Sequence, residues 1–526
     1  MHSRLTPARH VHPPRMPRQF RLFCVVASLC VLALTTPTAQ ARVTSAAPLA
    51  GSFAPGPCPI EPIAGLTIDC GSLTVAESRG KANSKTIQLA VAVLRSPNPA
   101  RAADPVLFLQ GGPGGATLAL AQFVALRYAP VLAQRDIVLI DQRGTGFSRP
   151  ALNCGAPATT TAMLRATVLL NGDRPAIVQQ QFDVLLACGA ALRSAGVDLA
   201  SYNSVESAAD LEDLRVALGY SAWNIAGFSY GTRLALTAME YRPQTIRSVV
   251  LDSPYPRQAN FHTDTFAGFQ RSLERLFNDC AIEFACLAAY PNLAATFDTM
   301  VARLNTTPAQ IPLRDPTSGQ TVYVPLSGDD VVSVIFSLMY QTEVIPVLPL
   351  LINETAKGNY AFFTQLFNTP VPTQPISSLG TLVAVQCNED VSFASARDFV
   401  VARDSNRRAS PLAFTSIFNE GILEICTAWG LGTPAGVENT PVRSDVPTLL
   451  VRGAYDHVTQ PEFATLAAQT LSRSFVLDPY PRGGHVVSLS SPCYARAVAS
   501  FFDDPTKRPN TSCLASTEGP QPFFVR

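Results

Sequence analysis

A short apolar run from Trp223 to Phe228 enters the pentapeptide Gly227-Phe228-Ser229-Tyr230-Gly231, and a helix-like segment from Arg233 to Tyr241 follows it. This pattern is typical of a sharp strand-to-helix turn that exposes a serine at its tip. The glycines matter because a backbone strained in this way leaves no room for side chains against the neighbouring strands. Ser229 is therefore the candidate nucleophile.

The pentapeptide alone is weak support, because similar runs occur in ordinary loops where a serine caps a helix. The downstream sequence adds to it. An apolar run over residues 446–451 leads to Asp456, and a second one over 475–477 leads to Gly483-Gly484-His485. Serine, aspartate and histidine in this chain order are one of the arrangements that form a catalytic triad.

The choice of histidine follows from their small number. Of six in the chain, three lie in the first twelve residues, inside a predicted leader. His262 is away from any predicted strand end and His457 directly follows Asp456, so both are predicted to be surface or packing residues. His485 remains as the general base, with Asp456 fixing its tautomer. Asp252, at the end of the apolar run 246–251, is the alternative acid.

A second glycine-rich segment, Gly111-Gly112-Pro113-Gly114-Gly115, follows the apolar run Val106 to Leu109. Proline has no N–H, so the predicted donors to a developing oxyanion are the backbone amides of Gly112 and of Tyr230, the residue after the serine. A phosphate-binding loop is the alternative, but the lysine and hydroxyl residue that it requires do not follow.

Together these motifs resemble those of the α/β-hydrolase exopeptidases of the proline iminopeptidase and tripeptidyl aminopeptidase family. The resemblance rests on Gly111-Gly112-Pro113-Gly114, on Asp141-Gln142-Arg143-Gly144-Thr145-Gly146-Phe147-Ser148 and on the Ser229 pentapeptide, in the family's order. The part from about Pro411 resembles the secreted tripeptidyl aminopeptidase branch. Gln110 departs from the histidine that relatives often carry. The Asp141 turn is predicted to be structural, with Arg143 bracing loops near the site.

The resemblance implies an α/β-hydrolase fold, a mostly parallel sheet flanked by helices. Strand-like and helix-like segments alternate over about 86–254 and 445–505, as such a sheet requires. The intervening 188 residues, 257–444, are too many for a simple connection and are rich in helical patterns. We therefore predict a core over 42–256 and 445–526, with a mainly helical cap domain over 257–444 inserted before the acid-bearing strand.

Composition favours an exported enzyme. The chain has 40 basic and 39 acidic residues, which leaves no positive surface of the kind that binds nucleic acid. The apolar stretch Leu22 to Leu34 is too short to span a bilayer comfortably and is followed by Ala39-Gln40-Ala41. We predict a signal peptide over 1–41, a secreted or periplasmic protein, and no stable membrane anchor after cleavage.

The chain has twelve cysteines, two of them in the predicted leader. The other ten are an even set for an oxidising compartment, and we expect them to pair. Neighbours in sequence would pair as Cys58–Cys70, Cys154–Cys188, Cys280–Cys286, Cys387–Cys426 and Cys493–Cys513, although spacing alone does not fix the connectivity. No Cys-x-x-Cys pair or histidine cluster indicates a metal site, and no cofactor is expected.

An aminopeptidase has to recognise a protonated α-amine, which carboxylates bind by charge-assisted hydrogen bonds. The apolar run from Val383 ends in Cys387-Asn388-Glu389-Asp390, and related enzymes carry an acid just after a similarly placed cysteine. Glu389 and Asp390 are therefore candidate substrate-binding residues. The alternative is a solvated loop or helix cap beside a disulfide.

The sequence as a whole predicts an exported serine exopeptidase that releases short N-terminal units, tripeptides or single residues, from peptide substrates through an acyl-enzyme. An esterase or amidase of the same fold is the alternative enzyme, because fold and triad do not determine the acyl group. An inactive hydrolase-fold binding protein is the non-enzyme alternative, which the complete Ser229, Asp456 and His485 set disfavours. The length of the released unit and the oligomeric state stay open.

Overall fold

The computed structural model describes residues 51–154, 174–314, 319–369, 377–414, 419–432, 438–516 and 518–525. These residues belong to a single compact unit that runs from Ala47 to Arg526. The predicted signal peptide over residues 1–41 lies outside the described residues.

The centre of this unit is a nine-stranded sheet in the order β1-β2-β3-β5-β4-β6-β7-β10-β11. Neighbouring strands from β5 to β11 run parallel, and β1, β2 and β3 pair antiparallel at one edge. The strands are β1 Ser52–Pro55, β2 Ile68–Ala76, β3 Thr86–Leu94, β4 Ala102–Leu109, β5 Arg135–Ile140, β6 Trp223–Phe228, β7 Ile246–Asp252, β10 Thr448–Val451 and β11 Ser474–Val476. The predicted mostly parallel sheet is confirmed.

Both faces of the sheet are buried, which explains why its central strands are continuous apolar runs. Strand β4 shows the two-residue period: Leu107 and Leu109 pack into one core, and Val106 and Phe108 pack into the other. The first core includes side chains of α5 Ser204–Ala217, α6 Tyr230–Tyr241 and α16 Pro461–Ala468. The second includes side chains of α1 Ala121–Arg127, α2 Ala129–Leu132 and α17 Pro492–Asp503.

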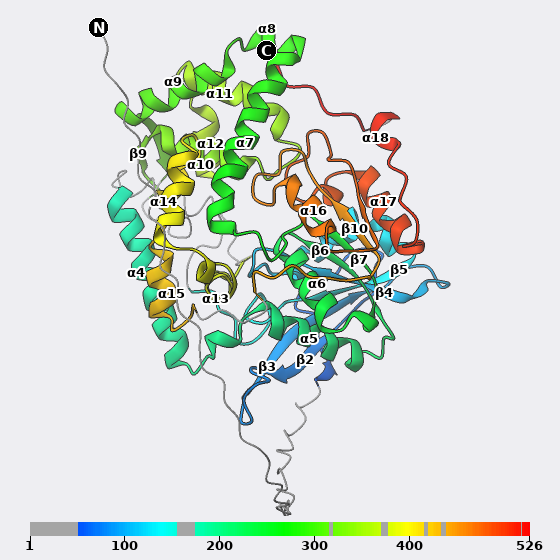
Figure 1. Ribbon diagram of the computed structural model, residues 1–526. Coiled ribbons are helices and arrows are strands. Elements are labelled where there is room, and N and C mark those ends of the chain that lie inside the picture. Colours follow the sequence, from blue (N-terminus) through cyan, green and yellow to red (C-terminus); the bar gives the residue numbers. More distant parts are fainter. Residues whose placement is uncertain are drawn as a thin grey trace, which may run out of the picture. The chain divides into compact units, whose positions relative to one another are not determined.

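The insertion between β7 and β10 is mainly helical, as predicted. It contains α7 Phe261–Ile282, α8 Phe284–Ala289, α9 Leu293–Thr306, α10 Gly328–Leu338, α11 Leu348–Ala356, α12 Ala361–Asn368, α13 Leu379–Glu389, α14 Ala396–Ser405 and α15 Ile422–Ala428, with a hairpin of β8 Ala309–Arg314 and β9 Thr321–Leu326. Figure 1 shows α7 leaving the sheet and extending to the group formed by α8, α9 and α11. A separate apolar core joins α7, α9, α10, α11, α12 and the hairpin.

One helix outside the predicted insertion packs with it. Helix α4, Arg174–Ser194, shares an apolar cluster with α13 and α15, to which it contributes Leu185 and Cys188 (Figure 1). The sequence placed this segment among the helices that flank the sheet. An apolar helix face does not reveal which surface it covers, so this contact could not be predicted.

All five predicted disulfides are present, Cys58–Cys70, Cys154–Cys188, Cys280–Cys286, Cys387–Cys426 and Cys493–Cys513. The Cys387–Cys426 bond joins α13 to α15, and the Cys154–Cys188 bond ties α4 to the chain that follows β5. The ten cysteines outside the predicted leader are therefore all oxidised, which suits an oxidising compartment. The last short helix, α18 Cys513–Ser516, is fixed by the Cys493–Cys513 bond.

Candidate active site

Ser229 lies on the predicted turn between β6 and α6. Its backbone has φ 56° and ψ −126°, a conformation that residues other than glycine rarely adopt. The flanking glycines are required by space: a Cβ on Gly227 would lie 2.6 Å from the carbonyl oxygen of Gly231, and a Cβ on Gly231 would overlap the carbonyl oxygen of Leu109 in β4. The pentapeptide thus holds Ser229 at the carboxyl end of the sheet.

The other two candidates meet at the carboxyl ends of β10 and β11. The Nδ1 atom of His485 lies 2.9 Å from Oδ2 of Asp456. The other oxygen of Asp456 accepts the backbone N–H groups of Val458 and Thr459, at 3.1 and 2.9 Å. Burial alone would raise the pKa of Asp456, but the attraction and hydrogen bond of His485 outweigh burial, and this pKa lies below its usual value. Asp456 is therefore ionised and shaped to orient His485.

Thr459 lies in the site but was not predicted from the sequence. Its hydroxyl donates to Oδ2 of Asp456 at 2.8 Å and lies 3.2 Å from Nδ1 of His485. The hydroxyl thus lies beside the direct contact between the carboxylate and the imidazole and touches both. A threonine three residues after the predicted acid was the available signal, but its meaning depends on the loop geometry.

Asp252, the alternative acid, makes different contacts. Its two oxygens accept the backbone N–H groups of Val487 and Ser488, at 3.3 and 2.8 Å. Complete burial raises the pKa of Asp252 to about 6. The structure therefore places Asp456 against the imidazole and Asp252 beneath the loop that carries it.

The loop that carries His485 is anchored from two sides. From the sheet, the hydroxyl of Ser253 accepts the N–H of Val486 at 2.8 Å. From the insertion, the carbonyl of Tyr340 accepts the N–H of His485 at 3.0 Å, and the hydroxyl of Thr342 accepts that of Gly484 at 3.1 Å. The insertion thus helps to position the imidazole.

Ser229 and His485 line one cavity of about 270 Å³. Gly112, with φ 118°, and Tyr230 line it as well, which brings the two predicted oxyanion donors to the same cavity. Tyr230 begins α6, so its N–H is one of the four at a helix start that lack an intrahelical acceptor. The rest of the wall is largely apolar and aromatic and includes Phe228, Tyr255, Phe261, Tyr340, Val458 and Val486.

The predicted bracing role of Arg143 agrees with its contacts. Its guanidinium binds the carboxylate of Asp210 at 2.8 Å and donates to the carbonyls of Glu77 and Ser201. These partners belong to three segments distant in sequence, so the fully buried Arg143 ties the turn after β5 to them.

His262 and His457 were predicted to be either surface or packing residues, and the structure shows that they are packing residues. Both are completely buried. His457 lies edge-on to the rings of Phe336 and Tyr340, and burial lowers its pKa to about 3, so it is neutral.

Glu389 and Asp390, at the end of α13, are 1% and 5% exposed, so the predicted alternative of a solvated loop is wrong. Both are ion-paired with Arg233 of α6, at 2.9 and 3.2 Å, and Glu438 binds the same guanidinium at 2.9 Å. Ser204 donates its N–H and its hydroxyl to Glu389. We call Arg233, Glu389, Asp390 and Glu438 the acid cluster.

The acid cluster is short of positive charge, since three carboxylates share one guanidinium. Burial, and then repulsion by Glu438 and Asp390, raise the pKa of Glu389 to about 7 against the attraction of Arg233. Neither Glu389 nor Asp390 is among the described residues that line the cavity, but Tyr255, which donates to Asp390 at 2.6 Å, and Gln386 are. The two predicted substrate-binding acids thus lie directly behind the cavity wall.

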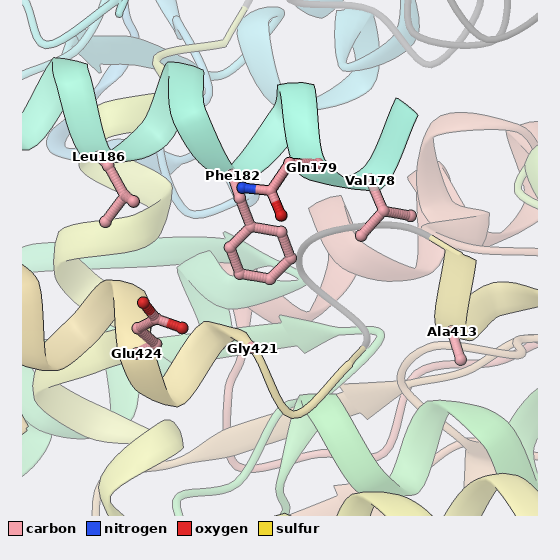
Figure 2. Close-up of a pocket in the computed structure, with 7 residues that line it drawn as sticks. All are labelled: Val178, Gln179, Phe182, Leu186, Ala413, Gly421 and Glu424. Carbon is pink, nitrogen blue, oxygen red and sulfur yellow. The ribbon is translucent and has the colours of Figure 1, made fainter. Parts of the chain in front are cut away.

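A second hollow, of about 430 Å³, lies between α4 and α15 (Figure 2). Figure 2 shows Gln179 and Phe182 extending from α4 toward the segment that holds Gly421 and Glu424. Its other lining residues are Val178, Leu186 and Ala413. None of these described residues supplies a nucleophile with a base, so the smaller cavity at Ser229 is the candidate active site.

Across the described residues, no group of histidine, cysteine and acidic side chains is arranged to hold a metal ion. In the same part of the chain, no helix is both long and apolar enough to cross a membrane.

Residues 104–303 match the family described as alpha/beta hydrolase fold, and residues 410–513 match the family described as TAP-like protein. The chain is a tripeptidyl aminopeptidase-like α/β-hydrolase. This serine hydrolase is 24% identical to the hydrolase YuaR of Escherichia coli K12 over 82% of its length and 83% of that protein.

Two further relatives are matched over shorter segments. The hydrolase is 29% identical to the serine protease Hip1 of Mycobacterium tuberculosis H37Rv, over 41% of its own chain and 42% of that protein. It is 30% identical to a tripeptidyl aminopeptidase of Streptomyces coelicolor, over 35% of each chain. The chain thus aligns with less than half the length of these two peptidases.

Proposed function

We propose that this hydrolase is an exported serine exopeptidase that removes short units from the free N-terminus of peptides. The observation that carries the proposal is the His485–Asp456 pair, at 2.9 Å, in a cavity that His485 shares with Ser229. The buried, ionised Asp456 keeps the proton of the neutral imidazole on Nδ1 of His485, so Nε2 is free to accept a proton.

In the proposed reaction, Oγ of Ser229 attacks the peptide carbonyl carbon, and its proton passes to Nε2 of His485. The carbonyl oxygen becomes an oxyanion that the backbone N–H groups of Gly112 and Tyr230 stabilise. As the C–N bond breaks, the proton moves from His485 to the leaving amine. Water then loses a proton to His485 and attacks the acyl-enzyme. As the bond between the acyl carbon and Oγ of Ser229 breaks, His485 returns that proton to Oγ, which releases the N-terminal unit and restores Ser229.

Selectivity for a free N-terminus is supported by the acid cluster. Three buried carboxylates around one guanidinium favour the approach of a further cation, and an α-ammonium is the cation that every free peptide carries. Glu389 and Asp390 are proposed to supply this attraction from behind the wall.

Export is supported by the five disulfides and by the predicted leader. Disulfides persist in oxidising compartments and are rare in the cytosol of mesophiles. We propose that the mature enzyme acts in the periplasm or outside the cell.

The proposal is tested with three chromogenic substrates: a tripeptide p-nitroanilide with a free amine, its N-acetylated twin, and p-nitrophenyl acetate. We expect the free-amine peptide to have the highest kcat/KM and acetylation to lower it by at least about tenfold, the loss of one charge-assisted contact. Efficient hydrolysis of the ester with no turnover of either peptide would support the esterase alternative and contradict the proposal.

A further inference from the structure

The wall of the active-site cavity contains a buried amide with an unused acceptor. Gln386 lies on α13, one turn before Glu389, and is 1% exposed. Within the described part of the protein, its Oε1 atom has no hydrogen-bond donor. Gln386 nevertheless lines the same cavity as Ser229 and His485.

An unpaired acceptor in a protein interior is costly, and buried side-chain oxygens nearly always have a donor. The terminal torsion of glutamine is broad, so the amide can turn toward the cavity at small cost. Turned in this way, Oε1 of Gln386 is available to accept a hydrogen bond from a molecule in the cavity.

The charged residues around Gln386 determine whether a positively charged or a neutral donor is favoured. Residues three and four positions apart on a helix are neighbours, which places Glu389 and Asp390 next to Gln386. In the acid cluster the only cation is Arg233, which already binds three carboxylates. The nearby Arg257 is paired with Glu240 at 2.7 Å, and Asp264 adds a further carboxylate near Asp390. The field at Gln386 is thus negative and favours a cationic donor over a neutral one.

We infer that Oε1 of Gln386 is the atom that receives the α-ammonium of the substrate, with the acid cluster attracting the charge from behind it. This inference rests on the proposed exopeptidase function and makes Gln386 a specificity-determining residue of the same site. It also accounts for two acids that are fully engaged with Arg233, Ser204 and Tyr255 and yet serve substrate binding.

Two variants test the inference. Gln386→Met keeps the size of the side chain and removes the acceptor, whereas Gln386→Glu keeps an acceptor. Gln179→Met, on the exposed side of α4, is the matched control for the change of residue type. Each protein is assayed on the free-amine tripeptide p-nitroanilide, its acetylated twin and p-nitrophenyl acetate, and its melting temperature is measured.

We expect Gln386→Met to lower kcat/KM for the free-amine peptide by about ten- to a hundredfold, mainly through KM, with ester hydrolysis unchanged and the melting temperature not lowered. Gln386→Glu should retain activity on the free-amine peptide. Equal losses on peptide and ester in Gln386→Met would show a structural role and overturn the inference, as would no loss on the peptide.

The remaining outcomes separate the two proposals. If Gln386→Glu loses as much as Gln386→Met, the amide serves as a donor, and the inference is wrong. If the wild type prefers the free-amine peptide and Gln386→Met keeps that preference, only the assignment of Gln386 fails. If the wild type cleaves the acetylated twin equally well, the exopeptidase function fails first and the inference fails with it.

Discussion

Two buried aspartates lie near His485, and the structure predicts very different results when each is changed to asparagine. Asp456 contacts Nδ1 of His485 at 2.9 Å, so Asp456→Asn presents an amide that favours the wrong imidazole tautomer. We expect kcat to fall by a factor on the order of 10⁴, as for this change in other triads. The fold should persist because the two side chains have the same shape.

Asp252→Asn acts on the loop rather than on the imidazole. The two oxygens of Asp252 accept two backbone N–H groups, and an asparagine leaves one of those groups facing an NH₂ donor. A hydrogen bond to a charged acceptor contributes about 1.5–3 kcal/mol, which bounds the loss at roughly ten- to a hundredfold. Since Ser253, Tyr340 and Thr342 still anchor the loop, we expect a loss of about tenfold.

The assay compares kcat/KM on a free-amine tripeptide p-nitroanilide with thermal melting of each variant. Asp404→Asn serves as a control because that carboxylate is exposed and pairs only with Arg403 among the described ion pairs. A larger loss from Asp252→Asn than from Asp456→Asn would refute our assignment of the acid.

Four further results are expected. Ser229→Ala and His485→Ala should each abolish turnover, and the double variant should lose little more, because a triad acts as a unit; additive losses in kcat would count against it. Thr459→Val should lower kcat by about ten- to a hundredfold, since it removes a hydrogen bond to the ionised Asp456. An unchanged kcat would show that the Thr459 hydroxyl does not contribute to catalysis. Glu389 is protonated below its pKa of about 7 and ionised above it, whereas the α-amine of the substrate loses its charge with a pKa of about 7.7–8. The ratio of kcat/KM for the free-amine peptide to that for the ester should therefore rise as pH increases from about 6 to 7; a flat ratio over this range would contradict the proposed role of Glu389. Thiol titration of the denatured mature enzyme should find no free thiol, and one or more would contradict complete pairing.

The features that the sequence predicted depend on short-range patterns. The turn at Ser229 requires glycines at fixed positions, and His485 follows a glycine pair after a strand. The five disulfides each join cysteines that are neighbours among the ten, so sequence proximity was sufficient.

The features that it did not predict depend on long-range packing. Asp252 and Asp456 both follow apolar strands, and only the arrangement of the His485 loop separates their contacts. For the acids at 389 and 390, the sequence could not separate a solvated position from a substrate-binding one, because nothing near them in sequence indicates that both pair with Arg233 on another helix. Gln386 belongs to the apolar run that starts at Val383, and nothing in that run indicates that Gln386 lines the active-site cavity.

Mass spectrometry of a peptide digest over time shows directly whether the enzyme is an exopeptidase. A peptide of known sequence and its N-acetylated twin are incubated with the mature enzyme and with Ser229→Ala. We expect stepwise release of short units from the free N-terminus, little cleavage of the acetylated twin, and none by Ser229→Ala. Internal cleavage, or equal cleavage of both peptides, would contradict the exopeptidase function.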